Sequence, residues 1–250
     1  MDISLVILTC NQRELTLRCI RSVYGLLERP GREIILVDNG STDGTSESVK
    51  AEFPAISILK LDKNYGVAGG RNRGLSLARG RRLMILDNDT VASPDAIEAL
   101  SEYLDKHPDV GLVAPRLISP QGDVQSSFRP YPGIFSKLSN IIAGKRKSSI
   151  ARSVPATPVE PFYVIGAAQM FDAEIYRSSG GLDENIFYGP EDADFCMSVR
   201  AAGKKVVYIP TLSIVHDWQR ATTSSLLSRG ARVHTRALLY FYRKHHRFFW

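Results

Sequence analysis

Residues 83–89 read Leu83-Met84-Ile85-Leu86-Asp87-Asn88-Asp89, so that four large apolar residues run directly into two carboxylates. A short apolar run of this kind is typical of a strand buried on both faces of a sheet. Ligands of open parallel sheets bind beyond the carboxyl ends of the strands, which is where Asp87 and Asp89 would lie. Two neighbouring acids repel each other unless a cation lies between them, and hard divalent ions that carry phosphate-bearing substrates use one or two carboxylates. The stretch predicts a metal site for a nucleoside diphosphate, although a D-x-D sequence alone is more often a solvated turn.

Similar apolar runs recur in the first half of the chain and alternate with segments of helical periodicity. Asn11 and Glu14 resemble an N-cap and its third-position acid, for a helix that reaches about Glu28. Ser93-Pro94 is typical of another helix start, with proline at the first helical position. The alternation predicts a parallel, three-layered α/β half over residues 3–115. The predicted strands are residues 3–9, 33–37, 56–61, 83–87 and 110–114.

The second half is less regular. Five prolines between residues 128 and 161 predict a loop-rich connection, within which residues 134–142 have helical spacing. A strand is expected over residues 162–171, and a helix that opens at residues 189–194 should stop at Gly203. Two short strands, residues 205–209 and 213–215, follow, and the second delivers His216.

The composition is that of an ordinary globular protein, with 44% hydrophobic and 23% charged residues among 250. The three cysteines form no C-x-x-C pair, and the chain enters a strand at once without a basic signal-peptide region. We therefore expect a reduced, cytoplasmic setting. No apolar run is long enough to span a bilayer. The net charge of +6 is concentrated in two acid-free segments, residues 124–159 and 218–250, which indicates an anionic partner at two places.

Several polar residues at predicted strand ends have both a functional and an ordinary structural interpretation. Asp38 can accept hydrogen bonds from a nucleobase or a ribose, or it can cap an Asx turn. The glycines of residues 66–74 can admit a phosphate at a helix N-terminus. They do not follow the first strand, however, so a dinucleotide-binding fingerprint is absent. Glu191 and Asp192 can act as a base or simply favour a helix start. His216 can complete a metal site or pack in the core.

Taken together and in order, these motifs resemble the family 2 glycosyltransferases. The segments that carry the resemblance are VILTCN (6–11), LVDNGSTDGT (36–45), NYGVAGGRNRG (64–74), LDND (86–89), GLDENIFYGPEDADFCMSVRAAG (181–203) and His216. The resemblance implies an inverting enzyme of GT-A fold, which is an α/β, Rossmann-like, mostly parallel sheet flanked by helices with a smaller acceptor-side half. VDNGSTDGT, NYGVAGGRN and the late YFYRKHH (240–246) are most similar to the bacterial rhamnosyltransferase and O-antigen branch.

The resemblance also implies roles for individual residues. Asp89, Asp87 and His216 would bind Mg²⁺ or Mn²⁺, and Asp192 would be the general base with Glu191 beside it. The donor would be dTDP-L-rhamnose or a UDP-sugar, and the acceptor a glycan or a polyprenyl-diphosphate-linked sugar. No nucleic acid is expected as a partner. The implied donor-binding residues are Thr9, Asn11, Asp38, Asn39, Ser41, Asn64, Gly66, Arg71, Asp87 and Asn88.

Two departures from the family pattern stand out. Cys10 lies where many relatives have an aromatic residue that stacks on the base, and the Q-x-x-R-W signature of processive synthases is absent after Gln219. Transfer of a single sugar is therefore expected. We expect one GT-A catalytic domain over residues 1–217, with a nucleotide-binding half (1–115) and an acceptor-binding half (116–217).

The basic aromatic segment 218–250 is expected to be helical. It would attach the enzyme to the inner face of the plasma membrane through anionic lipids and interfacial aromatics, or pack its aromatics on the catalytic domain. Two other functional classes share an acidic α/β site, namely a sugar nucleotidyltransferase or pyrophosphorylase, and a non-catalytic sugar- or membrane-binding module.

Overall fold

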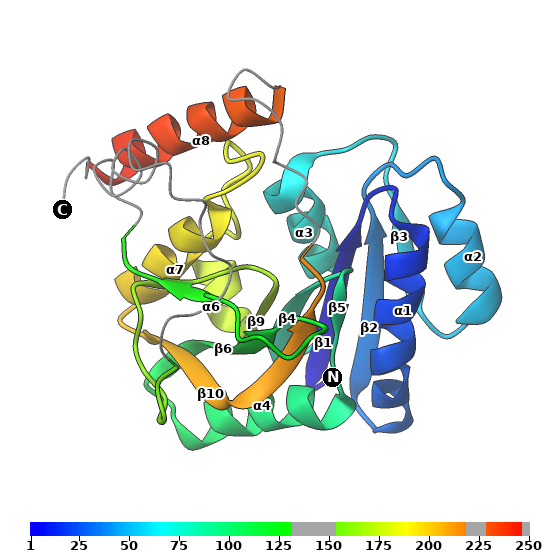
Figure 1. The fold of residues 1–250 in the computed structure, drawn as a ribbon, viewed down its shortest axis with the longest axis horizontal. Coiled ribbons are helices and arrows are strands. Elements are labelled where there is room, and N and C mark those ends of the chain that lie inside the picture. Colours follow the sequence, from blue (N-terminus) through cyan, green and yellow to red (C-terminus); the bar gives the residue numbers. More distant parts are fainter. Residues whose placement is uncertain (132–153, 219–228, 247–250) are drawn as a thin grey trace.

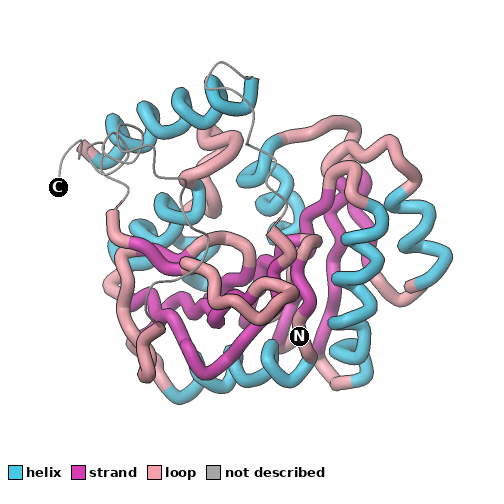
Figure 2. Tube along the Cα trace, viewed as in Figure 1, coloured by secondary structure: helices cyan, strands magenta, loops and turns pink. Residues whose placement is uncertain are grey.

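A computed structural model describes residues 1–131, 154–218 and 229–246. A central eight-stranded sheet is covered by helices on both faces, and one long helix, α8, lies over the elements of the second half of the chain (Figure 1). Figure 2 shows the same three layers as magenta strands between cyan helices. The predicted helical spacing of residues 134–142 and the bases Lys145, Arg146 and Lys147 lie outside the described residues.

The sheet has the strand order β3-β2-β1-β4-β9-β6-β10-β5. The first four strands pair in parallel, as the alternation of strands and helices predicts. The strand bounds are β1 (Ile3–Thr9), β2 (Arg32–Asp38), β3 (Ser57–Lys60), β4 (Arg82–Asp87), β5 (Thr90–Val91), β6 (Val110–Ile118), β9 (Ala168–Asp172) and β10 (Lys205–His216). β7 (Phe128–Arg129) and β8 (Tyr163–Val164) form a separate two-stranded sheet.

The second half of the chain enters the sheet of the first half. β9 pairs antiparallel with both β4 and β6. β6, which follows the helix Pro94–Lys106, therefore does not lie beside β4. The expected single strand over residues 162–171 is wrong in detail, because it divides into β8 and β9. Conversely, the two strands expected over residues 205–215 are one, β10, whose register with β6 is irregular between Ile209 and Ser213. Pro210 lies in that interval, where the missing N–H of proline is tolerated.

Seven α-helices are present among the described residues. α7 ends at Ala201, close to the predicted stop at Gly203, whereas α1 ends at Val23 and a 3₁₀ turn continues to the predicted Glu28. Ser93 caps α4 by accepting a hydrogen bond from the Ala96 N–H, as predicted. The predicted Asn11 cap is wrong: Gln12 precedes α1, and Asn11, with φ of 53°, instead accepts a hydrogen bond from the Thr42 N–H. The bounds are α1 (Arg13–Val23), α2 (Thr45–Glu52), α3 (Gly66–Leu77), α4 (Pro94–Lys106), α6 (Ala173–Ser178), α7 (Glu191–Ala201) and α8 (Arg229–His245), with a 3₁₀ turn at Tyr24–Glu28.

The strand sequences send alternate residues to two separate cores. Leu5 and Ile7 of β1 pack in the core beneath α1 and α4, whereas Val6 packs with α3 and α7 on the opposite face. Successive side chains of a strand point to opposite faces, so a continuous apolar run fills both. The strand ends that carry polar residues are thereby held in a rigid frame.

Helix α8 packs its aromatics on the domain, which is one of the two arrangements expected for the basic segment. Phe241 and Tyr242 are buried against Ile186 and Ala193, next to α7. These rings are therefore not available to a membrane interface; Phe248, Phe249 and Trp250 lie outside the described residues. Among the helices that the structure describes, none has the length and apolarity needed to cross a bilayer.

Candidate active site

The carboxyl end of β4 is brought next to the end of β10 by a tight turn. Asp87 closes β4, and the Thr90 hydroxyl donates to the Asp87 carbonyl oxygen at 2.7 Å. The short strand β5 then pairs antiparallel with β10, which places His216 opposite Thr90. The Asp217 N–H donates to the Asp89 carbonyl oxygen at 2.8 Å. Residues separated by more than a hundred positions thus share one sheet edge.

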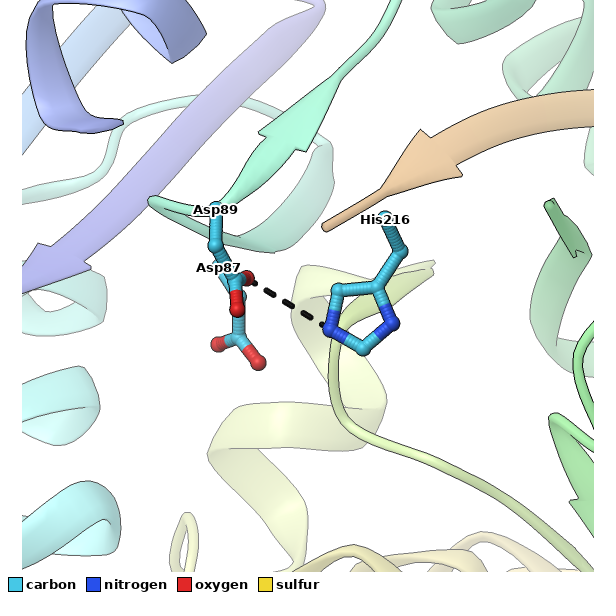
Figure 3. A group of neighbouring side chains, drawn as sticks. All are labelled: Asp87, Asp89 and His216. Atoms are coloured by element: carbon cyan, nitrogen blue, oxygen red, sulfur yellow. Dashed lines mark ion pairs between the residues drawn. The ribbon is translucent and has the colours of Figure 1, made fainter. Parts of the chain in front are cut away.

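This turn brings together the three predicted metal ligands. One ligand atom from each of Asp87, Asp89 and His216 lies within 4.8 Å of the others, and Figure 3 shows the side chains converging. His216 Nε2 lies 3.5 Å from Asp89 Oδ1, and both side chains are largely buried. Two carboxylates and one imidazole fit Mn²⁺, and also Mg²⁺, which prefers oxygen ligands. The residues present could therefore hold a divalent cation.

His216 has a further partner that the sequence did not indicate. The side-chain amide of Gln125 lies 2.7 Å from His216 Nδ1 and also donates to the His216 carbonyl oxygen at 2.7 Å. Gln125 is buried, and its segment between β6 and β7 lies 91 residues from His216. A lone glutamine in a loop carries no sequence signal for such a contact.

Arg71 links the predicted metal site to the predicted base. Its Nη2 donates to Asp87 Oδ1 at 2.6 Å and to the Gly166 carbonyl oxygen at 2.7 Å. Its Nη1 lies 3.5 Å from Glu191 Oε1, and the guanidinium is 3% exposed. A Cβ at Gly166 would come within 2.6 Å of Nη1, so glycine is required for this approach. The prediction gave Arg71 a place beside the nucleotide; the ion pairs with Asp87 and Glu191 are what the structure adds.

Glu191 and Asp192 form the first turn of α7. Burial, followed by the negative charge of Asp192, raises the pKa of Glu191 to about 7, against the lowering effect of Arg71. Burial also raises the pKa of Asp192, against the lowering effects of the Ala193 N–H, which donates at 2.7 Å, and of Arg71. Asp192 remains partly exposed, unlike Glu191. A carboxylate with a raised pKa that solvent can reach is suited to accept a proton.

Three predicted donor-binding residues use their side chains internally. Asp38 is almost fully buried and accepts hydrogen bonds from the Ser41 N–H, at 2.8 Å, and the Ser46 hydroxyl. These are the contacts of the Asx-turn alternative. The amide of Asn88 donates to the hydroxyl of Thr9 at 3.1 Å, so these two buried groups satisfy each other beneath the turn. In this arrangement the side chains of Asp38, Thr9 and Asn88 bind within the protein, at the same sheet edge as the other predicted donor-binding residues.

The remaining predicted donor-binding residues join the loops that follow β1, β2 and β3. The Asn11 N–H donates to the Ser41 hydroxyl at 2.9 Å, which joins the first two loops. Asn39 donates to Asn64 Oδ1 at 3.2 Å and to the Gly66 carbonyl oxygen at 2.9 Å, which joins the second to the start of α3. The structure therefore brings these residues together at one sheet edge, as the order of motifs predicts.

At Gly66 this edge contacts the loop that precedes α7. Its φ is +79°, and a Cβ there would come within 2.6 Å of the Phe187 carbonyl oxygen. That oxygen accepts a hydrogen bond of 2.8 Å from the Val67 N–H. The loop of Phe187, Tyr188 and Gly189 is thus held against the start of α3, immediately before Glu191.

Comparison with known families matches residues 4–154 to "Glycosyl transferase family 2" and residues 83–243 to "Glycosyl transferase family group 2". The first match alone covers more than half of the chain. The chain belongs to glycosyl transferase family 2. This glycosyltransferase carries the cluster of Asp87, Asp89 and His216 and the Glu191–Asp192 pair inside the matched regions.

Two relatives are named for rhamnosyl transfer. The N-acetylglucosaminyl-diphospho-decaprenol L-rhamnosyltransferase of Mycobacterium tuberculosis is 24% identical over 246 residues, which cover 91% of this glycosyltransferase and 80% of the relative. The dTDP-rhamnosyl transferase RfbF of Shigella flexneri is 24% identical over 218 residues, with coverages of 86% and 69%.

Solved structures show the same fold. A structure of GalNAc-T7 with UDP, GalNAc and Mn²⁺ superposes with a TM-score of 0.67 at 16% identity, covering 97% of this glycosyltransferase and 48% of that chain. The mannosyltransferase PcManGT from Pyrobaculum calidifontis, solved with GDP-Man and Mn²⁺, gives 0.61 at 18% identity, with coverages of 88% and 58%. The chain thus spans about half the length of these two proteins, and the GT-A type fold predicted from the sequence is confirmed.

We expect Arg71→Met to lower the free energy of unfolding by about 3 kcal/mol, because it leaves the Asp87 and Glu191 carboxylates without their buried cation. Arg73→Met, two residues along α3, is the matched control. Arg73 is 32% exposed and pairs with the exposed Glu184, so its loss should cost about 1 kcal/mol at most. Urea unfolding followed by circular dichroism measures both. Equal losses of unfolding free energy in the two variants would show that the buried ion pairs of Arg71 stabilise the protein no more than an exposed pair does.

Proposed function

We propose that this glycosyltransferase moves one sugar from a nucleoside diphosphate sugar to a hydroxyl of a glycan or lipid-linked acceptor, with inversion at the anomeric carbon. The observation that carries the proposal is that Asp87, Asp89 and His216 gather within 4.8 Å, while Arg71 bridges Asp87 to Glu191, next to Asp192. A cation site and a base thereby lie on two sides of one guanidinium. L-rhamnose carried on dTDP is the donor we favour, since both named relatives are rhamnosyltransferases; UDP-sugars are the alternative.

The donor side would be built from the strand-end loops. Asp87, Asp89 and His216 would hold Mg²⁺ or Mn²⁺, which when bound neutralises charge developing on the departing nucleoside diphosphate. The loops around Asn11 and Asn39 would border the nucleoside. Arg71, held in place by Asp87 and Glu191, keeps a fixed positive charge at this edge without needing to move during the reaction.

The acceptor side would be served by Asp192. The acceptor hydroxyl attacks the anomeric carbon from the face opposite the diphosphate, the carbon–oxygen bond to the diphosphate breaks, and the hydroxyl proton passes to the Asp192 carboxylate. Burial raises the affinity of this carboxylate for a proton, which suits it to that transfer. Glu191 accepts a hydrogen bond of 2.5 Å from the Gly189 N–H and so fixes the loop that carries Phe187 and Tyr188. Those two aromatic side chains are exposed and would contact the acceptor.

Attachment to an anionic membrane would use the outward face of α8. Arg232, Arg236 and Arg243 are exposed at helical spacing, with Leu239, which is 46% exposed, between them. The opposite face of α8 is buried through Phe241 and Tyr242. This orientation would present arginines, not aromatics, to lipid headgroups at the inner face of the plasma membrane, where a lipid-linked acceptor would reside.

Asp192→Asn should reduce turnover by roughly 10²- to 10⁴-fold while donor binding is retained, since the amide cannot take the acceptor proton. The measurement is release of nucleoside diphosphate from dTDP-L-rhamnose and from UDP-sugars, with acceptor and Mg²⁺ or Mn²⁺. In the unsubstituted enzyme, the rate should fall as pH is lowered, beginning at a higher pH than an ordinary aspartate gives, because the pKa of Asp192 is raised.

Asp95→Asn is the matched control for this experiment. Asp95 also lies in the first turn of a helix, α4, but its side chain is 87% exposed. This variant should keep full turnover. Undiminished turnover in Asp192→Asn would remove Asp192 as the base. Formation of nucleoside triphosphate from the nucleotide sugar and pyrophosphate, in place of transfer, would identify a pyrophosphorylase.

Asp89→Ala should weaken Mn²⁺ binding by more than the roughly 10- to 100-fold typical of removing a hydrogen-bond partner of a ligand, since it removes a ligand itself. Electron paramagnetic resonance of free Mn²⁺ gives the affinity, and calorimetry with dTDP or UDP in the presence and absence of Mn²⁺ gives the effect on donor binding. Asp109→Ala, at the start of β6 and 58% exposed, is the control and should bind normally. Unchanged Mn²⁺ affinity in Asp89→Ala would contradict the metal site.

Replacing Arg232, Arg236 and Arg243 together by Gln should lower partition onto vesicles containing phosphatidylglycerol by roughly 100-fold, since each arginine near an anionic surface contributes about 1 kcal/mol. Co-sedimentation with such vesicles, and with phosphatidylcholine alone, is the measurement. The control replaces Lys50, Lys106 and Lys205 by Gln. It removes the same amount of positive charge from other elements of the protein. Equal losses in the two triple variants, or equal binding to both vesicle types, would exclude α8 as the attachment face.

A further inference from the structure

The contact between Gln125 and His216 fixes the chemistry of the imidazole. The Gln125 side chain meets His216 at two points, the backbone carbonyl oxygen and ring atom Nδ1, each at 2.7 Å. A carbonyl oxygen only accepts hydrogen bonds, so the amide nitrogen of Gln125 must be the end that faces it. The amide oxygen of Gln125 is then the end that faces Nδ1.

The orientation of the amide determines which ring nitrogen carries the hydrogen. An amide oxygen cannot donate, so the contact at Nδ1 requires that Nδ1 bear a hydrogen and donate it. In the neutral imidazole, the lone pair is then on Nε2. The hydrogen is thus assigned by the partners of the amide, without reference to any metal.

The Nε2 lone pair of this tautomer faces a carboxylate. Nε2 lies 3.5 Å from Asp89 Oδ1, and the side chains of His216 and Asp89 are only 7% and 13% exposed. Two acceptor atoms that face each other in a buried place repel, and a cation between them removes the repulsion. The third member of the cluster, Asp87, supplies another oxygen within 4.8 Å.

We propose that Gln125 is a positioning residue that selects the Nδ1–H tautomer of His216 and so presents Nε2 as a ligand to a divalent cation. This inference rests on the metal site of the proposed function. Gln125 is itself anchored, because its N–H donates to the Leu117 carbonyl oxygen at 2.8 Å and its carbonyl oxygen accepts from the Ser127 N–H at 2.9 Å. Hydrogen-bond partners of metal-binding histidines typically contribute 10- to 100-fold to metal affinity.

The direct test observes the tautomer in the metal-free protein. Long-range proton–nitrogen correlation spectra of ¹⁵N-histidine-labelled protein, with His216→Gln to assign the signal, distinguish Nδ1–H from Nε2–H. We expect Nδ1–H in the unsubstituted chain and a shift toward Nε2–H in Gln125→Leu. An Nε2–H tautomer in the unsubstituted protein would overturn the inference even if no variant folds.

The second test measures Mn²⁺ affinity by electron paramagnetic resonance of the free ion. Gln125→Leu should bind Mn²⁺ roughly 10- to 100-fold more weakly. Gln125→Glu keeps an acceptor for Nδ1, although it loses the donor to the His216 carbonyl oxygen, and should bind Mn²⁺ more tightly than Gln125→Leu. Gln121→Leu, in the exposed turn before Gln125, is the control and should bind normally. Circular dichroism and thermal unfolding identify variants that have lost the fold.

The outcomes separate this inference from the proposed metal site. If His216→Gln weakens Mn²⁺ binding but Gln125→Leu does not, His216 is a ligand and Gln125 does not position it. Equal losses in Gln125→Glu and Gln125→Leu, with both folded, would also overturn the inference, because the acceptor at Nδ1 would then be irrelevant. If Asp89→Ala and His216→Gln both bind Mn²⁺ normally, the metal site itself fails.

Discussion

One buried guanidinium, that of Arg71, joins two parts of this glycosyltransferase that are far apart in the sequence. Arg71, from the glycine-rich helix α3, donates to Asp87 at the end of β4 and lies beside Glu191 at the start of α7. A buried charge is tolerated only when it is paired and its hydrogen bonds are satisfied, so the positions of both acids are constrained together. The absence of a side chain at Gly166 gives the guanidinium its room. One side chain thus joins Asp87, at the end of β4, to Glu191, at the start of α7.

The cluster of Asp87, Asp89 and His216 depends on a second constraint, which is the pairing of β5 with β10. The two-residue strand β5 exists because the chain turns back immediately after Asp89, and β10 is long enough to reach it. Gln125 then holds His216 from the other side. Asp89, His216 and Gln125 come from three segments that meet only through this sheet edge, so their mutual geometry is a property of the whole sheet.

Helix α8 is attached to the rest of the protein through charges as well as aromatics. Lys244 donates to both Asp183 and Asp194 at 2.8 Å, and His245 lies 2.7 Å from Asp194. Burial raises the pKa of Asp183, but hydrogen bonds from Lys244, Asn185 and Tyr240 outweigh this effect and lower the pKa to about 2. Lys244 and His245 are therefore used within the molecule, whereas Arg232, Arg236 and Arg243 on the outward face are exposed. Helix α8 thus packs on the domain with one face and exposes arginines on the other.

The sequence by itself determined the α/β class and the parallel pairing of β1 to β4, because apolar runs of strand length are a local signal. The meeting of Asp87, Asp89 and His216 was expected from the family resemblance, and the pairing of β5 with β10 brings it about. The resemblance to family 2 glycosyltransferases also followed from the sequence alone, because several motifs occur in the order typical of that family. The insertion of β9 between β4 and β6, the internal hydrogen bonds of Asp38 and Thr9, the Gln125 contact and the inward face of α8 were decided by the tertiary structure. Each depends on which distant segments become neighbours, and a single sequence carries no local signal for a contact that closes only when the sheet is complete.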